Sequence, residues 1–443
     1  MNLALAKNET GRALSDSFAI ARDRLPGTGS VAEARSAAFE AYDRVGLPHR
    51  RIEDWKYTDL RALMREVLPL APAPDAAALA RAAAAVKVKP QTIKGVRRLV
   101  LVDGVFAPKL SELAGLEKGL AVRTLRDVLE AGEAALQAQL FTPDNANPMV
   151  ALNSAMMTDG VVIEIGNGVV LTQPLHVIHI ASGSAPAAMF TRSLLRLGKD
   201  AGATLVESYI AADGATAYQV HDSLIVTIGD NSRLDQIRLI EDGREAVNIS
   251  SAVITLGAHA HFNTFGMTSG AAVSRYQATI TFAGEHSRVE TNGVNLLNGR
   301  QHADTTLFMD HAVPHCASRE VFRAVADDRG HSVFQGRIIV RPDAQKTDAK
   351  MMTRALLLSD EAEADNKPEL EIFADDVTCG HGATTGALDE SLLFYLRARG
   401  LSEKEAQALL IQAFVGEAIE SIVNDDLREL AIAAAQRWLE ARG

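Results

Sequence analysis

The sequence predicts a mainly β fold in which a parallel β-solenoid lies between two helical regions. Short β-type runs, separated by glycine, asparagine and aspartate, fill the chain from Gly160 to about Gly380. Helical patterns occur only outside this stretch, whereas doubly wound α/β folds need helices between their parallel strands. Glycine turns also recur at a nearly constant spacing, which is typical of stacked repeats. An antiparallel sandwich with irregular hairpins is the alternative, but two-residue hairpin signals are scarce.

The first region, residues 1 to about 150, is predicted to be mostly helical. Residues 31–45 have the helical spacing of apolar side chains. Asp75 and Thr124 have the sequence context of helix N-caps, the first before an alanine-rich run and the second before a helix expected to reach about residue 140. Residues 99–102, followed by Asp-Gly, predict a single strand and a turn.

The central region combines strand runs with repeated glycine turns. Several runs alternate apolar and polar residues, which is the period of a pleated strand. The first four turn glycines are 31, 28 and 27 positions apart, and two more follow after 46 and 50 positions, near two steps each. We expect glycine in these turns because it tolerates φ > 0. The runs are 161–165, 175–180, 224–228, 237–240, 277–282 and 332–340, and the glycines are Gly198, Gly229, Gly257, Gly284, Gly330 and Gly380.

The last region returns to helix. Residues 389–399 are predicted to be helical up to Gly400, Ser402 and Glu405 form a capping-box pattern, and Asn424 is placed to cap a final helix. An apolar stripe on the middle helix predicts that it folds back on the end of the solenoid or binds another protein. The predicted domains are 1–150, 151–387 and 388–443.

Composition restricts the functions that this chain can have. Its 443 residues carry a net charge of −11, which argues against binding nucleic acid through phosphate contacts. Only two cysteines are present, so no disulfide framework is expected and a reducing compartment fits best. Residues 1–18 lack the apolar run of a secretion signal, and no stretch approaches 18 consecutive apolar residues. We therefore expect a cytoplasmic protein without a membrane helix.

Cys379 and His381 are the strongest candidates for metal ligands. No P-loop, dinucleotide fingerprint, zinc-protease helix or C-x-x-C pair is present, so the chain is not expected to be an ATPase or to hold a closed metal cage. On a strand, residues two apart point to the same face. A thiolate with an imidazole suits zinc, copper or an iron–sulfur species. Two ligands leave the coordination incomplete, so others would come from another chain or a small molecule, and simple packing is the alternative.

The remaining histidines favour structural roles. His311, His315 and Cys316 match no known zinc spacing, and we expect these histidines to hydrogen-bond across coils. His259 and His261 are expected on one face of a strand, as surface or corner residues.

Two further motifs leave alternatives open. Residues 53–58 combine charge with Trp55 and Tyr57, and packing between domains is predicted ahead of a partner contact. Acidic pairs such as Asp375-Asp376 are predicted to be solvated or capping groups in turns. The alternative is a β-helical carbohydrate-active enzyme, which would use such acids with calcium across a cleft.

Six stretches of the sequence have a recognisable pattern: 46–57, 309–316, 327–337, 344–348, 368–384 and 394–400. They resemble the SufB/SufD family of iron–sulfur cluster assembly subunits, and in particular its SufD branch. His381 lies between Gly380 and Gly382, where the SufB branch typically has Glu-His-Glu-Ala-Thr, and the further cysteines expected of SufB are missing. Two departures from SufD members are Gly380, where they often carry serine, and residues 353–355, where they tend to be asparagine-rich.

The resemblance implies a right-handed parallel β-helix flanked by N-terminal and C-terminal helical domains. It implies a scaffold subunit without catalytic residues, which pairs with SufB through the β-helices and docks the ATPase SufC on the C-terminal helical domain. An isolated chain would be able to form a homodimer instead. His381 and Cys379 would lie near the SufB interface as cluster-assembly ligands. No cofactor is expected on the isolated chain, and a transient Fe–S cluster is expected in the complex.

Overall fold

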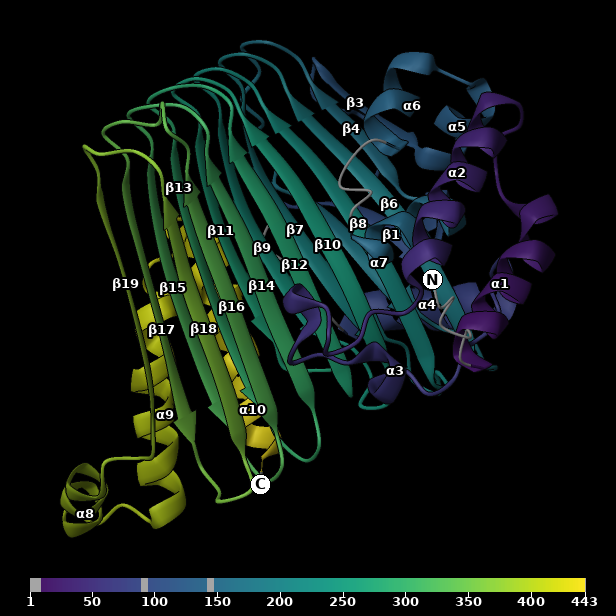
Figure 1. Ribbon diagram of the computed structural model, residues 1–443. Helices are drawn as coiled ribbons and strands as arrows, with labels where there is room; N and C mark the ends of the chain where they lie inside the picture. The colour runs from purple at the N-terminus through teal and green to yellow at the C-terminus, as the bar shows by residue number, and fades with distance from the viewer. Residues whose placement is uncertain (1–8, 89–94, 142–146, 443) are drawn as a thin grey trace, which may run out of the picture.

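Two sheets of mainly parallel strands face each other over most of the molecule (Figure 1). The computed structural model describes residues 9–88, 95–141 and 147–442; residues 1–8, part of the stretch in which no secretion signal is expected, lie outside it. The ten-stranded sheet contains, in spatial order, β19 (Thr378–Gly386), β17 (Asp348–Leu357), β15 (Ala317–Ala326), β13 (Arg288–Leu297), β11 (His261–Thr268), β9 (Arg233–Glu241), β7 (Gly202–Ala211), β5 (Leu175–Ala181), β1 (Arg97–Val102) and β2 (Val105–Phe106). The nine-stranded sheet contains β18 (Glu363–Ile372), β16 (His331–Val340), β14 (His302–His311), β12 (Val273–Phe282), β10 (Val247–Leu256), β8 (Tyr218–Ile228), β6 (Ala187–Leu197), β4 (Val161–Ile165) and β3 (Leu120–Thr124).

Consecutive strands alternate between the two sheets from β4 onward, so each coil contributes one strand to each sheet. Neighbouring coils stack in register: every residue of β10 pairs with one of β8 and one of β12, in parallel. Among the described strands, antiparallel pairing occurs only at the N-terminal end, between β1 and β2 and between β3 and β4. The predicted parallel β-solenoid is therefore confirmed, and the antiparallel sandwich is wrong.

The core of the solenoid is the space between the two sheets. Because side chains alternate across a strand, every second residue points inward, and in-register stacking turns these residues into columns. One column contains Ile254, Ile280, Met309 and Ile338, each at most 2% exposed. Full burial of one such side chain contributes about 1.5–3 kcal/mol, so every added coil extends the core.

The turn glycines are needed because the turns of neighbouring coils approach each other closely, and not because the backbone adopts a positive φ at these positions. A Cβ on Gly229 would lie 2.6 Å from the carbonyl carbon of Gly198, in the turn of the neighbouring coil. Positive φ is adopted two residues further on, by Asp200 (56°), Asn231 (55°) and the equivalent residues of later turns. The expectation that glycine supplies the left-handed conformation is therefore wrong for these turns.

The repeat also ends earlier than predicted. Gly284 stacks on the turn of Gly257, which continues the series. Gly330, however, lies in the turn between β15 and β16, at the opposite edge of the solenoid, and Gly380 lies inside β19. The sequence spacing of these two glycines is close to two repeat lengths, but neither occupies the turn position that the first four glycines share.

The predicted helix caps are confirmed. The side chain of Asp75 accepts a hydrogen bond from the amide of Ala78 (2.7 Å), and Ser402 forms its capping box with Glu405. The helix predicted after Thr124 is divided, because Gly132 ends its first part in a left-handed conformation. The helices are α1 (Glu9–Ala21), α2 (Ser30–Val45), α3 (Leu60–Leu63), α4 (Ala76–Val88), α5 (Leu125–Ala131), α6 (Ala134–Phe141), α7 (Pro148–Met156), α8 (Glu390–Ala398), α9 (Glu403–Ile419) and α10 (Asp425–Ala441).

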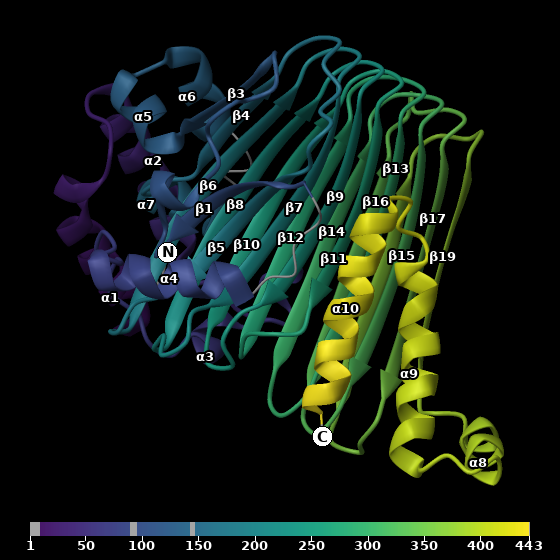
Figure 2. The same cartoon turned by 180° about the vertical axis from the view of Figure 1, so that it is seen from behind.

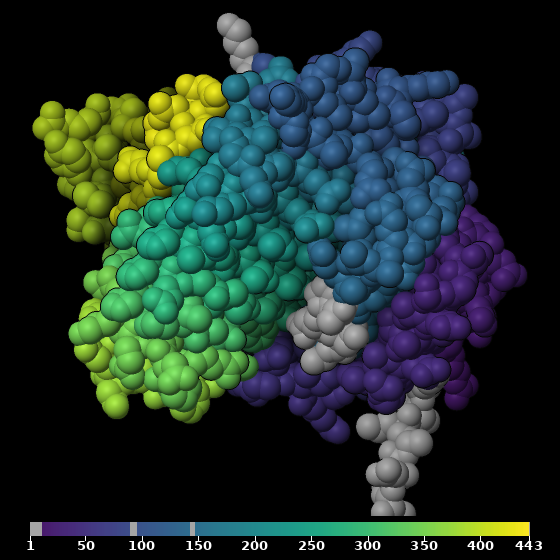
Figure 3. All heavy atoms as spheres, turned by 90° about the horizontal axis from the view of Figure 1, so that it is seen from above, coloured from purple at the N-terminus to yellow at the C-terminus, as the bar shows by residue number. Residues whose placement is uncertain are grey.

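The helices leave one end of the solenoid open. The N-terminal helices gather beside the first coils, and the last coils lie at the other side of the molecule (Figure 3). Helices α9 and α10 lie on the outer face of the ten-stranded sheet (Figure 2), where Ile411 and Leu430 join a buried cluster with Ile237 and Leu296. The apolar stripe thus covers the side of the solenoid rather than its end. None of the described helices is long and apolar enough to span a membrane.

Residues 53–58 pack against the outer face of the nine-stranded sheet. The ring of Trp55 is 2% exposed and lies 3.9 Å from the guanidinium carbon of Arg275, which forms a buried ion pair with Asp304. Glu53 reaches the final strand of this sheet and pairs with Lys367 at 2.5 Å. The packing role predicted for this motif is confirmed, and the motif spans the sheet from β12 to β18.

Candidate functional site

Cys379 and His381 lie on β19, the last strand of the ten-stranded sheet. In the register of that sheet, Cys379 is opposite Ala349 and His381 is opposite Met351. Both of these partners are buried between the two sheets. Cys379 and His381 therefore face the interior of the solenoid at its open end, on the same side of the strand as the spacing predicts.

The two side chains differ in their surroundings. Cys379 is half-buried and packs against the apolar core between the sheets. This burial raises the pKa of the Cys379 thiol above its ordinary value, although the backbone amide of Ala349 works in the opposite direction. His381 is exposed. The isolated chain thus presents a thiol and an accessible imidazole, and a metal ion or a new cationic neighbour would favour the thiolate.

The end of the solenoid is an open pair of strand edges. Strands β18 and β19 are terminal in their sheets, with no further strand beyond them in the described part of the chain. Side chains form a polar chain across the interior here: the Thr353 hydroxyl donates to Oδ1 of Asn366 (2.7 Å), and Nδ2 of Asn366 donates to the hydroxyl of Thr385 (3.1 Å). Unpaired strand edges of this kind are templates for another chain.

Cys379 and His381 do not complete a metal site alone. Across residues 9–88, 95–141 and 147–442, no group of three or more histidine, cysteine, aspartate or glutamate side chains is arranged to hold a metal ion. A site at this end therefore needs donors from outside the described chain.

Glu320 is a polar group behind the site that was not predicted from the sequence. It is opposite Met351, which is opposite His381, so the three share one interior column. Glu320 is 1% exposed, and neither carboxylate oxygen has a hydrogen-bond partner in the part of the chain that the structure describes. Burial raises the pKa of Glu320 to about 8, so this side chain carries a proton at neutral pH. The sequence feature that could have revealed this group is a glutamate at an inward-facing position of the strand, between Ser318 and Phe322.

The other histidines have structural positions. His311 is buried between the sheets, where its ring stacks on Phe282 and its Nε2 lies 3.1 Å from the hydroxyl of Ser318, on the next strand of the same coil. His315 lies in an exposed turn with φ of 60° and stacks on His286 at 4.8 Å. Cys316 is buried, and its thiol lies 3.5 Å from two carbonyl oxygens.

His259 and His261 are not on one strand face. His259 adopts φ of 54° in the turn and stacks on His286 at 5.0 Å, whereas His261 begins β11. The turn conformation breaks the alternation on which the prediction was based. No hydrogen bond among the described residues links any of these histidines to Cys379 or His381.

Comparison with known proteins places this geometry in a family. A model described as SUF system FeS cluster assembly, SufBD core domain, matches residues 179–414, and one described as SufBD protein N-terminal region matches residues 26–177. The chain is 31% identical over 393 residues to the iron–sulfur cluster assembly protein SufD of Escherichia coli, which covers 88% of this chain and 89% of that protein. An iron–sulfur cluster assembly SufBD family protein of Synechocystis is 30% identical over 399 residues, 88% of this chain and 86% of that protein.

The fold defines a β-solenoid protein with helices at both termini and an open end that presents Cys379 and His381. This fold and the two family models together identify the class of protein. The chain belongs to the SufB/SufD family of iron–sulfur cluster assembly proteins, and the resemblance of its motifs to SufD is confirmed.

Proposed function

We propose that this chain is a scaffold subunit, without catalytic residues of its own, of a SufBCD complex that assembles iron–sulfur clusters. The observation that carries the proposal is the open terminal strand β19, which presents Cys379 and His381 from the interior face. The similarity to a protein named for this assembly supports it.

The partner at the open end is a second β-solenoid chain, SufB. Edge strands bind another chain by adding its strands to the sheet, with backbone hydrogen bonds giving affinity and side chains giving specificity. Pairing at β18 and β19 would bring donors of SufB next to Cys379 and His381. These residues would then bind the growing cluster transiently, as cargo, and the isolated chain would hold no cofactor. An isolated chain would use the same edges to form a homodimer.

The ATPase subunit SufC docks on residues 388–443. Helix α8 supports this assignment because Leu392, Phe394 and Tyr395 are 51%, 74% and 54% exposed. Helix α9 is tied to the sheet by the ion pair of Arg323 and Glu417. ATP binding would draw two SufC subunits together, and the motion of these helices would shift the SufB interface and rearrange the cluster ligands.

The proposal also assigns domains and a compartment. Residues 1–150, 151–387 and 388–443 would act as the N-terminal, solenoid and docking units. The assembly would be cytoplasmic, because cluster chemistry with free thiols needs a reducing environment.

Replacement of His381 tests the ligand role in cells. In a strain that depends on this chain, we expect His381→Ala to lower the activity of iron–sulfur enzymes severalfold, while SufB and SufC still co-purify with the variant. His259→Ala, which changes an exposed histidine in a distant turn, is the matched control and should have no effect. Normal maturation of iron–sulfur enzymes in the His381→Ala strain would contradict the proposed ligand role.

A further inference from the structure

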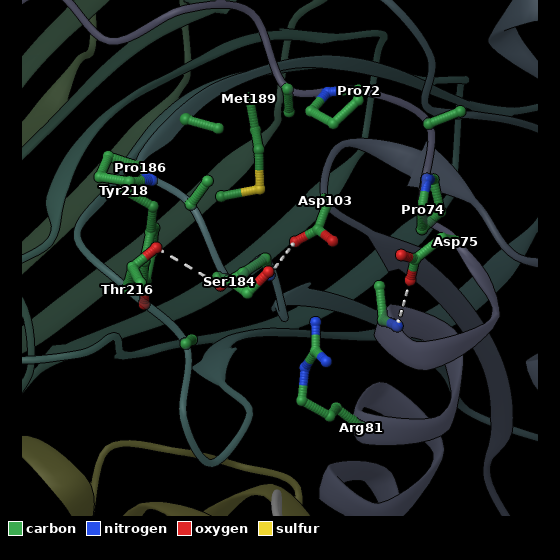
Figure 4. A pocket seen from close by; sticks show the side chains of 18 of the residues that line it. Pro72, Pro74, Asp75, Arg81, Asp103, Ser184, Pro186, Met189, Thr216 and Tyr218 are labelled. Atoms are coloured by element: carbon green, nitrogen blue, oxygen red, sulfur yellow. Dashed lines mark hydrogen bonds between the residues drawn. The ribbon is translucent and has the colours of Figure 1, made fainter.

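A cavity of about 360 Å³ lies beside the first coils (Figure 4). In the strand order of the sheets these coils are remote from β19. Its walls are the segment 69–75, helix α4, and the turns at 181–187 and 215–218. Pockets for small molecules typically measure about 300–1,000 Å³. A second cavity, inside the solenoid, measures only about 30 Å³, which leaves room for little more than water.

One wall of the cavity is fixed before any ligand binds. The segment 69–71 runs beside β6 and forms two backbone hydrogen bonds with it, from Ala71 to the carbonyl of Ala188 and from Ala188 to that of Pro69, both 2.8 Å. Prolines at 69, 72 and 74 further restrict this segment. Binding would therefore cost little ordering of the wall, which favours affinity.

Most of the lining is apolar. Ala71, Ala181 and Met189 are each at most 8% exposed, and Pro72, Pro74 and Pro186 line the rim. A ligand with an apolar body would gain about 25 cal/mol for each Å² that it buries here.

The acidic and phenolic groups of the lining already have partners. Asp103 accepts hydrogen bonds from the amide of Ser182 (2.7 Å) and that of Gly183 through one oxygen, and from the hydroxyl of Ser182 through the other. The hydroxyl of Tyr218 donates to Asp242 (2.8 Å) and accepts from the amide of Gly243. Asp75 caps α4 and is itself exposed to solvent. Asp103 and Tyr218 therefore have little capacity left to recognise a ligand, whereas the carboxylate of Asp75 is solvated.

Arg81 is the group with unused donors. Its Nε donates to the carbonyl of Ser182 (2.8 Å), the same residue that Asp103 holds, so the guanidinium is anchored. Its two terminal nitrogens have no hydrogen-bond partner within the described residues, and Figure 4 shows them directed into the cavity between Ser184 and Asp75. A guanidinium with a free edge binds the oxygens of a carboxylate, sulfonate or phosphate.

We propose that this cavity binds a small amphipathic organic anion, with its apolar body against the alanines, prolines and Met189 and its anionic group on Arg81. Ser184 lines the cavity beside Arg81, its hydroxyl has no hydrogen-bond partner within the described residues, and it offers a further donor to the same group. The site is independent of the cluster ligands and goes beyond the scaffold role.

Two dyes with the same aromatic skeleton test the proposal with the full-length protein. The anionic probe is 1-anilinonaphthalene-8-sulfonate, and the neutral probe is N-phenyl-1-naphthylamine, which lacks the sulfonate. We expect the anionic dye to bind more tightly, by about tenfold, since a hydrogen bond to a charged group contributes about that much. Arg81→Gln should remove this advantage and leave the neutral dye unchanged, and Arg81→Lys should restore part of it.

A filling variant and a distant control localise the signal. Ser184→Trp places a large side chain in the cavity from an exposed turn and should weaken both dyes severalfold, with an unchanged circular dichroism spectrum. Arg329→Gln, which removes an exposed arginine in the turn before β16, should change neither dye. Equal affinity for the two dyes, or anionic dye binding that survives both Arg81→Gln and Ser184→Trp, would overturn the proposal.

Discussion

The environment of Glu320 makes the stability of the chain depend on pH. A buried carboxyl without a hydrogen-bond partner remains protonated, because burial disfavours its charged form. In the folded chain its pKa is about 8, whereas in the unfolded chain it has the ordinary value near 4.3. Between these values the folded state holds a proton that the unfolded state has released. The contribution of Glu320 to stability therefore falls as the pH rises from about 4.5 to about 8.

The variant Glu320→Gln should lose this pH dependence. At pH 5 its free energy of unfolding should be close to that of the wild type, and at pH 8 it should be higher, by on the order of 3 kcal/mol. Urea unfolding at the two pH values measures both quantities. Glu285→Gln, at an exposed turn, is the control and should follow the wild type. Parallel pH profiles for Glu320→Gln and the wild type would contradict the assignment.

At the scale of elements, the segment 53–58 and helix α8 have opposite roles. Trp55 is buried against Arg275, and the segment holds strands of the nine-stranded sheet together from outside. Helix α8 leaves three large apolar side chains in solvent. The first element therefore stabilises the solenoid, whereas the second is available to a partner.

Trp55→Ala should destabilise the chain by about 3–5 kcal/mol, the usual cost of removing a buried aromatic side chain. Part of this loss comes from the contact between the ring and the Arg275 guanidinium. Trp55→Phe keeps a ring over Arg275 and should cost clearly less. Urea unfolding of the two variants gives the comparison, and a loss below about 1 kcal/mol for Trp55→Ala would contradict the packing role.

Phe394→Asp should abolish co-purification of SufC and leave stability within about 0.5 kcal/mol of the wild type, because the side chain is 74% exposed. Lys404→Asp, which changes the charge of an exposed position on neighbouring α9, is the control and should retain SufC. Full retention of SufC by the Phe394 variant would place the docking surface elsewhere.

At the scale of the whole molecule, in-register stacking decides what the sequence alone could predict. It forces equivalent turns to recur at similar distances, and the missing side chains of Gly229 and Gly257 permit their close approach, so the solenoid was visible as a period. The same-face geometry of Cys379 and His381 followed from strand alternation. The position of Glu320 in an inward-facing column could not be predicted, because it depends on the register between coils that are about 30 residues apart in the chain.

The position of the C-terminal helices could also not be predicted from the sequence. An apolar stripe shows that a helix needs an apolar partner, but it does not say which surface supplies it. Here the outer face of the ten-stranded sheet has its own apolar residues, such as Val206 and Phe265, and attracts α9 and α10. The end of the solenoid stays open as a result, and the Cys–His pair stays accessible to another chain.

The central claim is that Cys379 and His381 are part of a cluster site that a second solenoid chain completes. Its most direct test is the iron and acid-labile sulfide content of the purified, reconstituted complex with SufB and SufC, for the wild type and for His381→Ala. The account predicts that the variant retains both partners in unchanged amounts and holds severalfold less iron and sulfide. Equal cluster content in the two complexes would contradict it.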